Sequence, residues 1–217
     1  MTRRNQRPTR RPTKPEREHR RLTATAYHEA GHAVIGWHLD LGVRRVTIVR
    51  NDAQGSLGHA LFGRFRKNFR PDVELTPATK EHLDRNVLCS LAGPLAEKKH
   101  TGRHNSAGAR QDYEDALNSA EFLTGSVDGR LERAYLQWAR LRVEQLLGGV
   151  WWEEIEAVAQ RLLRDRTITR KQLEEAVRSV VHKLDPNVLA AMSASARDAE
   201  SVSPEEWRRR VREADGR

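Results

Sequence analysis

His28 and His32 are the residues of this sequence best placed to hold a metal ion. They stand four residues apart in the run His-Glu-Ala-Gly-His, and four residues on a helix make slightly more than one turn, so both imidazoles lie on one face. Glu29 is one residue round from His28 and is placed to reach a metal-activated water as a general base. The spacing therefore indicates a zinc metallopeptidase site.

The alternative interpretation of the same five residues is a surface helix whose His and Glu side chains are solvated and have no function. Their neighbours favour a buried helix instead, because they are small or apolar: Ala30, Gly31, Ala33, Val34 and Ile35. Buried histidine and glutamate need polar partners. We therefore prefer the metal interpretation.

A catalytic zinc site needs a third protein ligand and an open position. His38 follows His32 by six residues, as in the metzincin pattern, but Ile35 stands where that pattern needs glycine. On a continuous helix His38 would point about 120° away from the metal face. Asp112 is the stronger candidate, because the small residues 107–109 before it would let its helix approach the helix of His28 and His32, which we call the His-Glu helix.

The chain resembles the peptidase domain of the FtsH family of ATP-dependent zinc metalloproteases over roughly residues 20–180. The resemblance rests on three segments in order: His28-Glu29-Ala30-Gly31-His32-Ala33, Leu91-Ala92-Gly93 followed by Ala96-Glu97, and Gly108-Ala109 followed by Asp112. It departs from the family at Pro94 and Ala107, where the family usually has arginine and threonine.

The resemblance implies that His28, His32 and Asp112 bind Zn²⁺ and that Glu29 is the catalytic base. Glu97 matches an acidic position of the family and is the second candidate, either as a ligand or as a partner of one. The expected function is zinc metalloendopeptidase: zinc activates water and the scissile carbonyl, and Glu29 moves the proton to the leaving amine.

The sequence holds no Gly-x-x-x-x-Gly-Lys-Ser/Thr loop, so we expect a stand-alone peptidase module without its own ATPase. Its expected partners are a protein or peptide substrate and, as candidates, a separate ATPase or unfoldase chain and a second copy of itself. The alternative function is a non-catalytic or weakly catalytic zinc-containing adaptor that binds nucleic acid or a protein through a basic arm. The presence of Glu29 argues against that alternative, because a structural zinc site has no use for a base.

The predicted fold is mainly α (α+β), with a small antiparallel β-hairpin beside the His-Glu helix. That helix is expected to begin at Thr23 or Thr25 and to end near Leu39, and the hairpin is expected over residues 43–49 and 57–62. A helix from Thr76 should break or kink at Gly93-Pro94. Further helices are predicted over residues 106–123, 129–147, 150–163 and 169–182, the last with Thr169 and Gln172 as a capping box. A short helix is expected from residues 203–206 to about 211.

Charge divides the chain into three expected parts: a disordered basic tail (1–21), the peptidase domain (22–183) and a peripheral C-terminal segment (184–217). The tail carries nine Lys/Arg against two Glu, so it supplies +7 of the net charge of +9. It could hold a polyanion such as nucleic acid by charge alone. A single cysteine, no membrane-length apolar run and no signal-peptide core predict a cytoplasmic protein.

Overall fold

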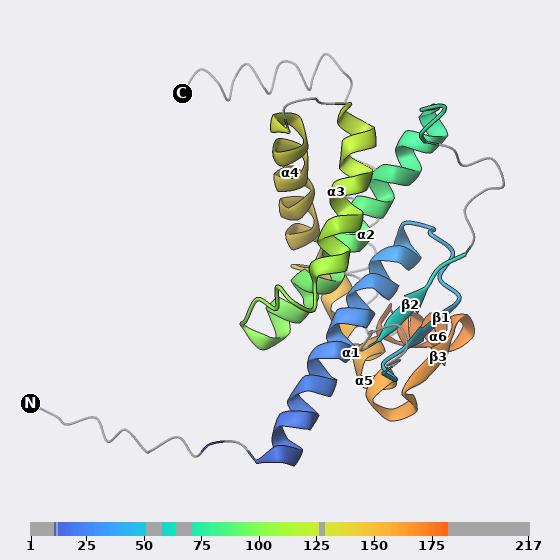
Figure 1. The fold of residues 1–217 in the computed structure, drawn as a ribbon. Coiled ribbons are helices and arrows are strands. Elements are labelled where there is room, and N and C mark those ends of the chain that lie inside the picture. Colours follow the sequence, from blue (N-terminus) through green and yellow to red (C-terminus); the bar gives the residue numbers. More distant parts are fainter. Residues whose placement is uncertain (1–10, 12, 51–57, 64–70, 126–128, 182–217) are drawn as a thin grey trace, which may run out of the picture. The chain divides into compact units, whose positions relative to one another are not determined.

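The fold is built around one long helix, α1 (Lys14–His38). A computed structural model describes residues 11, 13–50, 58–63, 71–125 and 129–181 (Figure 1). Residues 1–178 form one compact unit, and residues 179–217 form another. The remaining helices are α2 (Pro77–Thr101), α3 (Arg110–Thr124), α4 (Arg130–Leu146), α5 (Val150–Asp165) and α6 (Arg170–Val181).

Every residue of α1 from Ala26 to Gly36 is buried. A helix that is buried on all sides needs neighbours on all sides, and α2 and α5 supply most of this cover. Gly31 allows the close approach of α2, because a Cβ there would lie 2.7 Å from the Ala92 carbonyl oxygen. Small residues thus set the distance between α1 and α2.

A three-stranded antiparallel sheet lies beside α1, with strand order β2-β1-β3. β1 (Arg45–Thr47) and β2 (His59–Leu61) form the predicted hairpin, with Val46 opposite Ala60. β3 (Thr167–Thr169) pairs with the other edge of β1, with Val46 opposite Ile168. The mainly α fold with a small antiparallel sheet is therefore confirmed.

α2, α3 and α4 pack against one another (Figure 1), and α3 begins beside the middle of α1. Fully buried aliphatic side chains from all parts of the unit join in one core, among them Ile35, Val46, Val87, Val143, Ile155, Ile168 and Leu173. Within the described part of the chain, no helix is both long and apolar enough to cross a bilayer.

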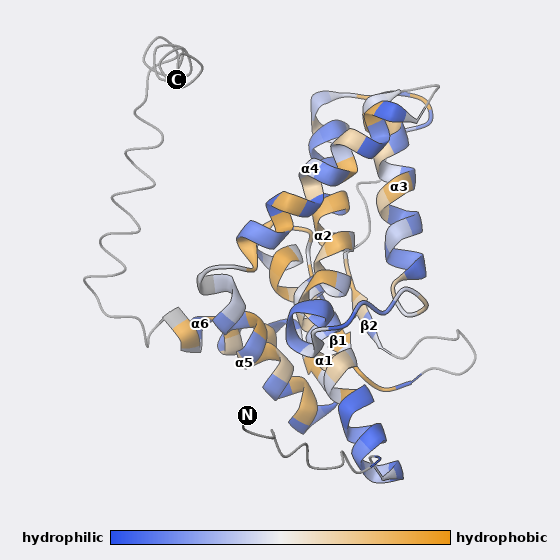
Figure 2. Ribbon diagram, turned by 90° about the vertical axis from the view of Figure 1, so that its left-hand side faces the viewer, coloured by the Kyte–Doolittle hydropathy of each residue, from blue (hydrophilic) through white to orange (hydrophobic). Residues whose placement is uncertain are grey.

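The predicted start of the first helix is wrong. α1 begins at Lys14, because Thr13 and Glu16 form a capping box: the Thr13 amide donates to the Glu16 carboxylate, and the Glu16 amide donates to the Thr13 hydroxyl. Residues 14–21, predicted as disordered, are the exposed first turns of α1 and are hydrophilic in Figure 2. Residues 1–10 and 12 lie outside the described residues, as does the predicted short helix that ends near residue 211.

Two other helices and one strand differ from the prediction. Of the break or kink expected at Pro94, the break does not occur: α2 continues for seven residues beyond it, because its buried packing outweighs the one hydrogen bond that proline removes. The kink stays a prediction. α3 begins at Arg110 rather than Ser106, since residues 106–109 form turns. β3 was not predicted, whereas the capping box at Thr169 and Gln172 is present at the start of α6.

Candidate metal centre

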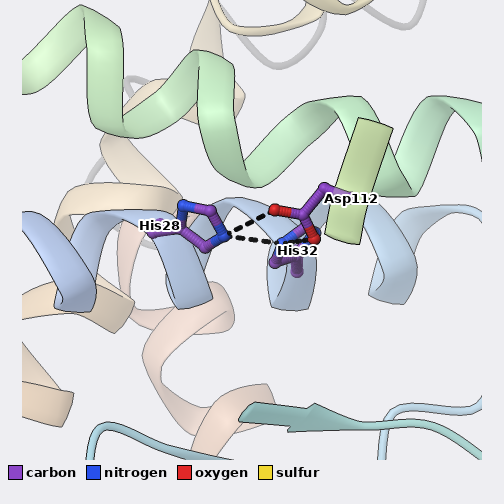
Figure 3. Close-up of side chains that lie close together, drawn as sticks. All are labelled: His28, His32 and Asp112. Atoms are coloured by element: carbon purple, nitrogen blue, oxygen red, sulfur yellow. Dashed lines mark hydrogen bonds and ion pairs between the residues drawn. The ribbon is translucent and has the colours of Figure 1, made fainter. Parts of the chain in front are cut away.

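His28, His32 and Asp112 meet at one point of the structure (Figure 3). The two histidines lie on the same face of α1, one turn apart, and Asp112 lies in the first turn of α3. α2 packs against both helices, so it joins two segments that are 80 residues apart in the chain. The three residues predicted as ligands are thus brought together.

The ligand-type atoms of these three side chains face one another. Nε2 of His28 lies 3.0 Å from Oδ2 of Asp112, and Nε2 of His32 lies 3.1 Å from Oδ1 of the same carboxylate. The two Nε2 atoms are 3.1 Å apart. His28 and His32 are 9% and 8% exposed, so most of the surface of both rings is covered by protein.

The opposite nitrogens of both rings are hydrogen-bonded to groups of α2. Nδ1 of His28 donates to Oε2 of Glu97 at 3.0 Å, and Nδ1 of His32 donates to the carbonyl oxygen of Cys89 at 2.8 Å. A carbonyl and an ionised carboxylate can only accept, so both Nδ1 atoms carry the hydrogen. In a neutral ring the Nε2 atom then has a lone pair.

This arrangement places two Nε2 lone pairs and two Asp112 oxygens within hydrogen-bond distance of one another. Four acceptors at these distances repel unless a positive charge lies among them. A proton on an imidazole meets that need, and so does a metal cation. The donor set of two imidazoles and one carboxylate fits Zn²⁺, which commonly takes such a set in hydrolytic sites.

The pKa shifts of the three groups likewise indicate that a positive charge is favoured between them. Burial is the largest single influence and lowers the pKa of His28 and His32. The hydrogen bonds to Asp112 and to Glu97 or Cys89, with the nearby negative charge, together outweigh it and raise both, that of His32 well above its ordinary value. Burial raises the pKa of Asp112, but its bonds to both histidines hold that pKa well below its usual range. The metal-free site thus favours cationic histidine beside anionic aspartate.

Glu29 is buried beside this cluster and lines the same cleft. It is 6% exposed, and the backbone amide of Ala60 in β2 donates to its carboxylate. Burial raises its pKa, although the neighbouring histidines oppose the rise, so the group is poised to accept a proton. The cleft has a volume of about 1690 Å³ and is lined by α1, β2, α2 and α3.

The other two candidates for the third ligand lie elsewhere. His38 is at the far end of α1, where Nε2 pairs with Oε2 of Glu154 at 2.5 Å and the ring stacks on Trp151. Glu97 contacts the Nδ1 side of the His28 ring, away from Asp112. Its position fits the predicted role of a partner that orients a ligand.

Two features that shape the site were not predicted from the sequence. Gly93 of α2 lies directly under His32: a Cβ at this position would be 2.2 Å from Nε2. Asn105 donates from Nδ2 to Oε1 of Glu97 at 3.0 Å. Gly93 stands in a segment that the resemblance had marked, but no sequence pattern pointed to Asn105.

Comparison with known proteins gives one family and several relatives. The model of Peptidase family M41 matches residues 15–124, which include all the residues of the cluster. An "ATP-dependent zinc metalloprotease FtsH" of Mycoplasma mobile is 33% identical over 102 residues, which are 46% of this chain and 13% of that protein.

Two further relatives extend the comparison. The protein of the same name from Mesoplasma florum is 27% identical over 173 residues, 70% of this chain and 25% of the relative. The "Mitochondrial inner membrane m-AAA protease component YTA10" of Saccharomyces cerevisiae is 30% identical over 117 residues, 53% of this chain and 14% of the relative. The chain thus matches between 13% and 25% of the length of these three relatives.

Proposed function

The chain belongs to Peptidase family M41, and from this we propose that it is a zinc metalloendopeptidase in which His28, His32 and Asp112 hold Zn²⁺ and Glu29 is the general base. The observation that carries the proposal is the convergence of the three ligand-type side chains beside a buried carboxylate. The relatives are named zinc metalloproteases, which agrees with the donor set found here.

The residues divide the chemistry between them. A bound Zn²⁺ supplies Lewis acidity, which makes water more acidic and polarises a carbonyl group. Glu29 takes the proton of the attacking water on a carboxylate oxygen and returns it to the nitrogen of the leaving amine. The amide of Ala60 holds the Glu29 carboxylate in place. Glu97 and the Cys89 carbonyl fix the hydrogen on Nδ1 of the two rings, so Nε2 stays free to bind the metal.

β2 is proposed to hold the substrate. Among the described strands it is an edge strand, with β1 on one side, and residues 58–60 line the cleft together with Glu29. An extended peptide can add to such an edge through main-chain hydrogen bonds, which depend little on side-chain identity. We therefore expect a peptidase that accepts extended segments of many sequences.

The test is hydrolysis of an unfolded protein by the purified 217-residue chain, with zinc content measured on the same sample. We expect about one zinc per chain and cleavage that is lost on chelation and regained when zinc is added. ATP should leave the rate unchanged, since these residues hold no phosphate-binding loop. A zinc-loaded chain that hydrolyses no unfolded protein would favour the adaptor function, or a need for a separate ATPase chain.

A further inference from the structure

We propose that Asn105 is a positioning residue for the metal centre: through Glu97 it fixes the orientation of the His28 ring, and through Gly108 it ties that ring to the turn that leads to Asp112. The inference rests on the proposed zinc site. It adds to that site a residue outside the ligands, the base and their direct partners.

The contacts form a continuous chain of hydrogen bonds. Nδ2 of Asn105 donates to Oε1 of Glu97 at 3.0 Å, while Oε2 of the same carboxylate accepts from Nδ1 of His28 at 3.0 Å. On its other side, Oδ1 of Asn105 accepts from the amide of Gly108 at 3.0 Å. Gly108 is four residues before Asp112, so one amide side chain connects the supports of two proposed ligands.

The groups on the two sides of Asn105 determine which way its amide points. A carboxylate can only accept and a backbone N–H can only donate, so the NH₂ group must face Glu97 and the oxygen must face Gly108. The reverse orientation would set two acceptors against each other at Glu97 and two donors at Gly108. Asparagine satisfies both neighbours, whereas aspartate satisfies Gly108 alone.

Gly108 lies so close to the Asn105 amide that the space between them leaves no room for a side chain at position 108. A Cβ at Gly108 would lie 2.4 Å from Nδ2 of Asn105, so a side chain there would displace the amide. Glu97 is 7% exposed, and a buried carboxylate that loses a hydrogen-bond donor is free to turn away from His28. The His28 ring would then lose the contact that holds its Nδ1 hydrogen.

A charge exchange between Glu97 and Asn105 tests the inference. Asn105→Asp keeps the acceptor for Gly108 but sets a second carboxylate against Glu97, so we expect zinc affinity, measured by competition with a chelator, to fall about tenfold. Asn105→Ala removes the donor without adding charge and should lower the affinity by a smaller factor. Ser106→Asp adds the same charge at the next, exposed residue and is the matched control, with wild-type affinity expected.

The double variant Glu97→Gln with Asn105→Asp restores the hydrogen bond between positions 97 and 105 and moves the negative charge from position 97 to position 105. The glutamine side chain introduced by Glu97→Gln accepts from His28 through its oxygen and donates to the new aspartate through its nitrogen. We therefore expect higher zinc affinity than in either single variant. A purely structural loop contact would not give this rescue. The inference is overturned if Asn105→Asp binds zinc like the wild type, or if the double variant is no better than the single ones.

Zinc affinity separates this inference from the proposed function. A wild-type chain that binds zinc but hydrolyses nothing would contradict the peptidase assignment, while the Asn105 variants would still report on the positioning of His28. A wild-type chain that binds no zinc would overturn both.

Discussion

At the scale of single residues, Glu29 is distinguished from the three proposed ligands by where its carboxylate points. It receives an amide hydrogen from β2 and lies in the cleft, whereas the ligand-type atoms of His28, His32 and Asp112 face one another. The proposed base and the proposed metal ligands can therefore be removed separately by mutation, and the two kinds of change should give different results.

Glu29→Gln should keep zinc and the fold but lose most hydrolysis. Glutamine has nearly the same shape, yet it cannot accept the water proton, and loss of a positioned general base costs about 100- to 10,000-fold in rate. The turnover number and the zinc content of the variant are the quantities to measure. Near-normal turnover would contradict the role of Glu29.

Asp112→Ala should lower zinc affinity and abolish activity, because it removes one of three proposed ligands. His38→Ala is the comparison, and it should leave zinc affinity unchanged. It should lower the free energy of unfolding by about 2 kcal/mol, because the Glu154 carboxylate is 2% exposed and loses its partner. Chelator competition and chemical denaturation of both variants measure the two effects, and a zinc defect in His38→Ala would contradict the assignment.

At the scale of elements, α2 determines the geometry of the site although it carries none of the proposed ligands. Gly31 of α1 packs on the backbone of α2, and Gly93 of α2 packs under His32. Cys89 and Glu97 of the same helix accept hydrogens from the two rings. A change in α2 should therefore reach the metal through the histidines.

Gly93→Ala should weaken zinc binding by about tenfold or more, since the added Cβ would fall 2.2 Å from Nε2 of His32 and the ring would have to move. Gly149→Ala is the matched control, because a Cβ there meets no atom within 4 Å. The zinc affinities of the two variants should differ clearly. Equal affinities would show that His32 is not held by this contact.

More of the candidate site than of its surrounding contacts could be predicted from the sequence. His28, Glu29 and His32 lie within five residues, so local helix geometry predicts their common location. The meeting of Asp112 with them depends on tertiary packing and was expected from the resemblance. The bonds of Asn105 and the Cys89 carbonyl have no local signature, because neither residue type nor spacing specifies them.

The fold was predictable where the signals were local. The cap at Thr76 and the box at Thr169 mark helix starts correctly. The same kind of box at Thr13 and Glu16 stands among basic residues, whose charge favours a disordered tail. β3 has three residues and pairs with a strand about 120 residues earlier. So short a strand has no periodicity to recognise, and its pairing follows from tertiary structure alone.

At the scale of the whole molecule, the proposed site makes zinc and protons compete for the same histidines. In the metal-free protein the pKa values of His28 and His32 are raised, so their contribution to stability is present below the ordinary histidine pKa of about 6.5. That contribution is lost as the pH rises through the raised values. Zinc binding needs neutral rings, so it strengthens over the same range.

We therefore expect the difference in Tm between zinc-loaded and chelated protein to widen as the pH rises above the ordinary histidine pKa of about 6.5. The increase should level off once both rings are neutral without metal. The measurement is thermal unfolding at several pH values with and without a chelator. Tm values that stay parallel over this range would contradict a site made of two histidines with raised pKa.

The basic tail can be tested at the boundary that the structure gives. Deletion of residues 1–12 removes five arginines and no acidic residue but leaves the Thr13 cap of α1 in place. Peptidase activity on short peptides should be unchanged. Polyanion binding should weaken, and the slope of log K against log salt concentration should become shallower by up to about five. An unchanged salt dependence would exclude residues 1–12 as the binding segment.

The pairing of β1 with β3 also constrains the order in which the chain can fold. All proposed site residues lie before α4, in contacts between α1, α2 and α3, but α1 also needs α5 to cover its buried residues. β1 gains its second neighbour from residues 167–169. During synthesis from the N-terminus, the histidines and Asp112 thus leave the ribosome well before the elements that complete the fold around them. Closure of so long a loop is entropically unfavourable, so we expect the covering of α1 by α5 and the pairing of β3 to come late in folding.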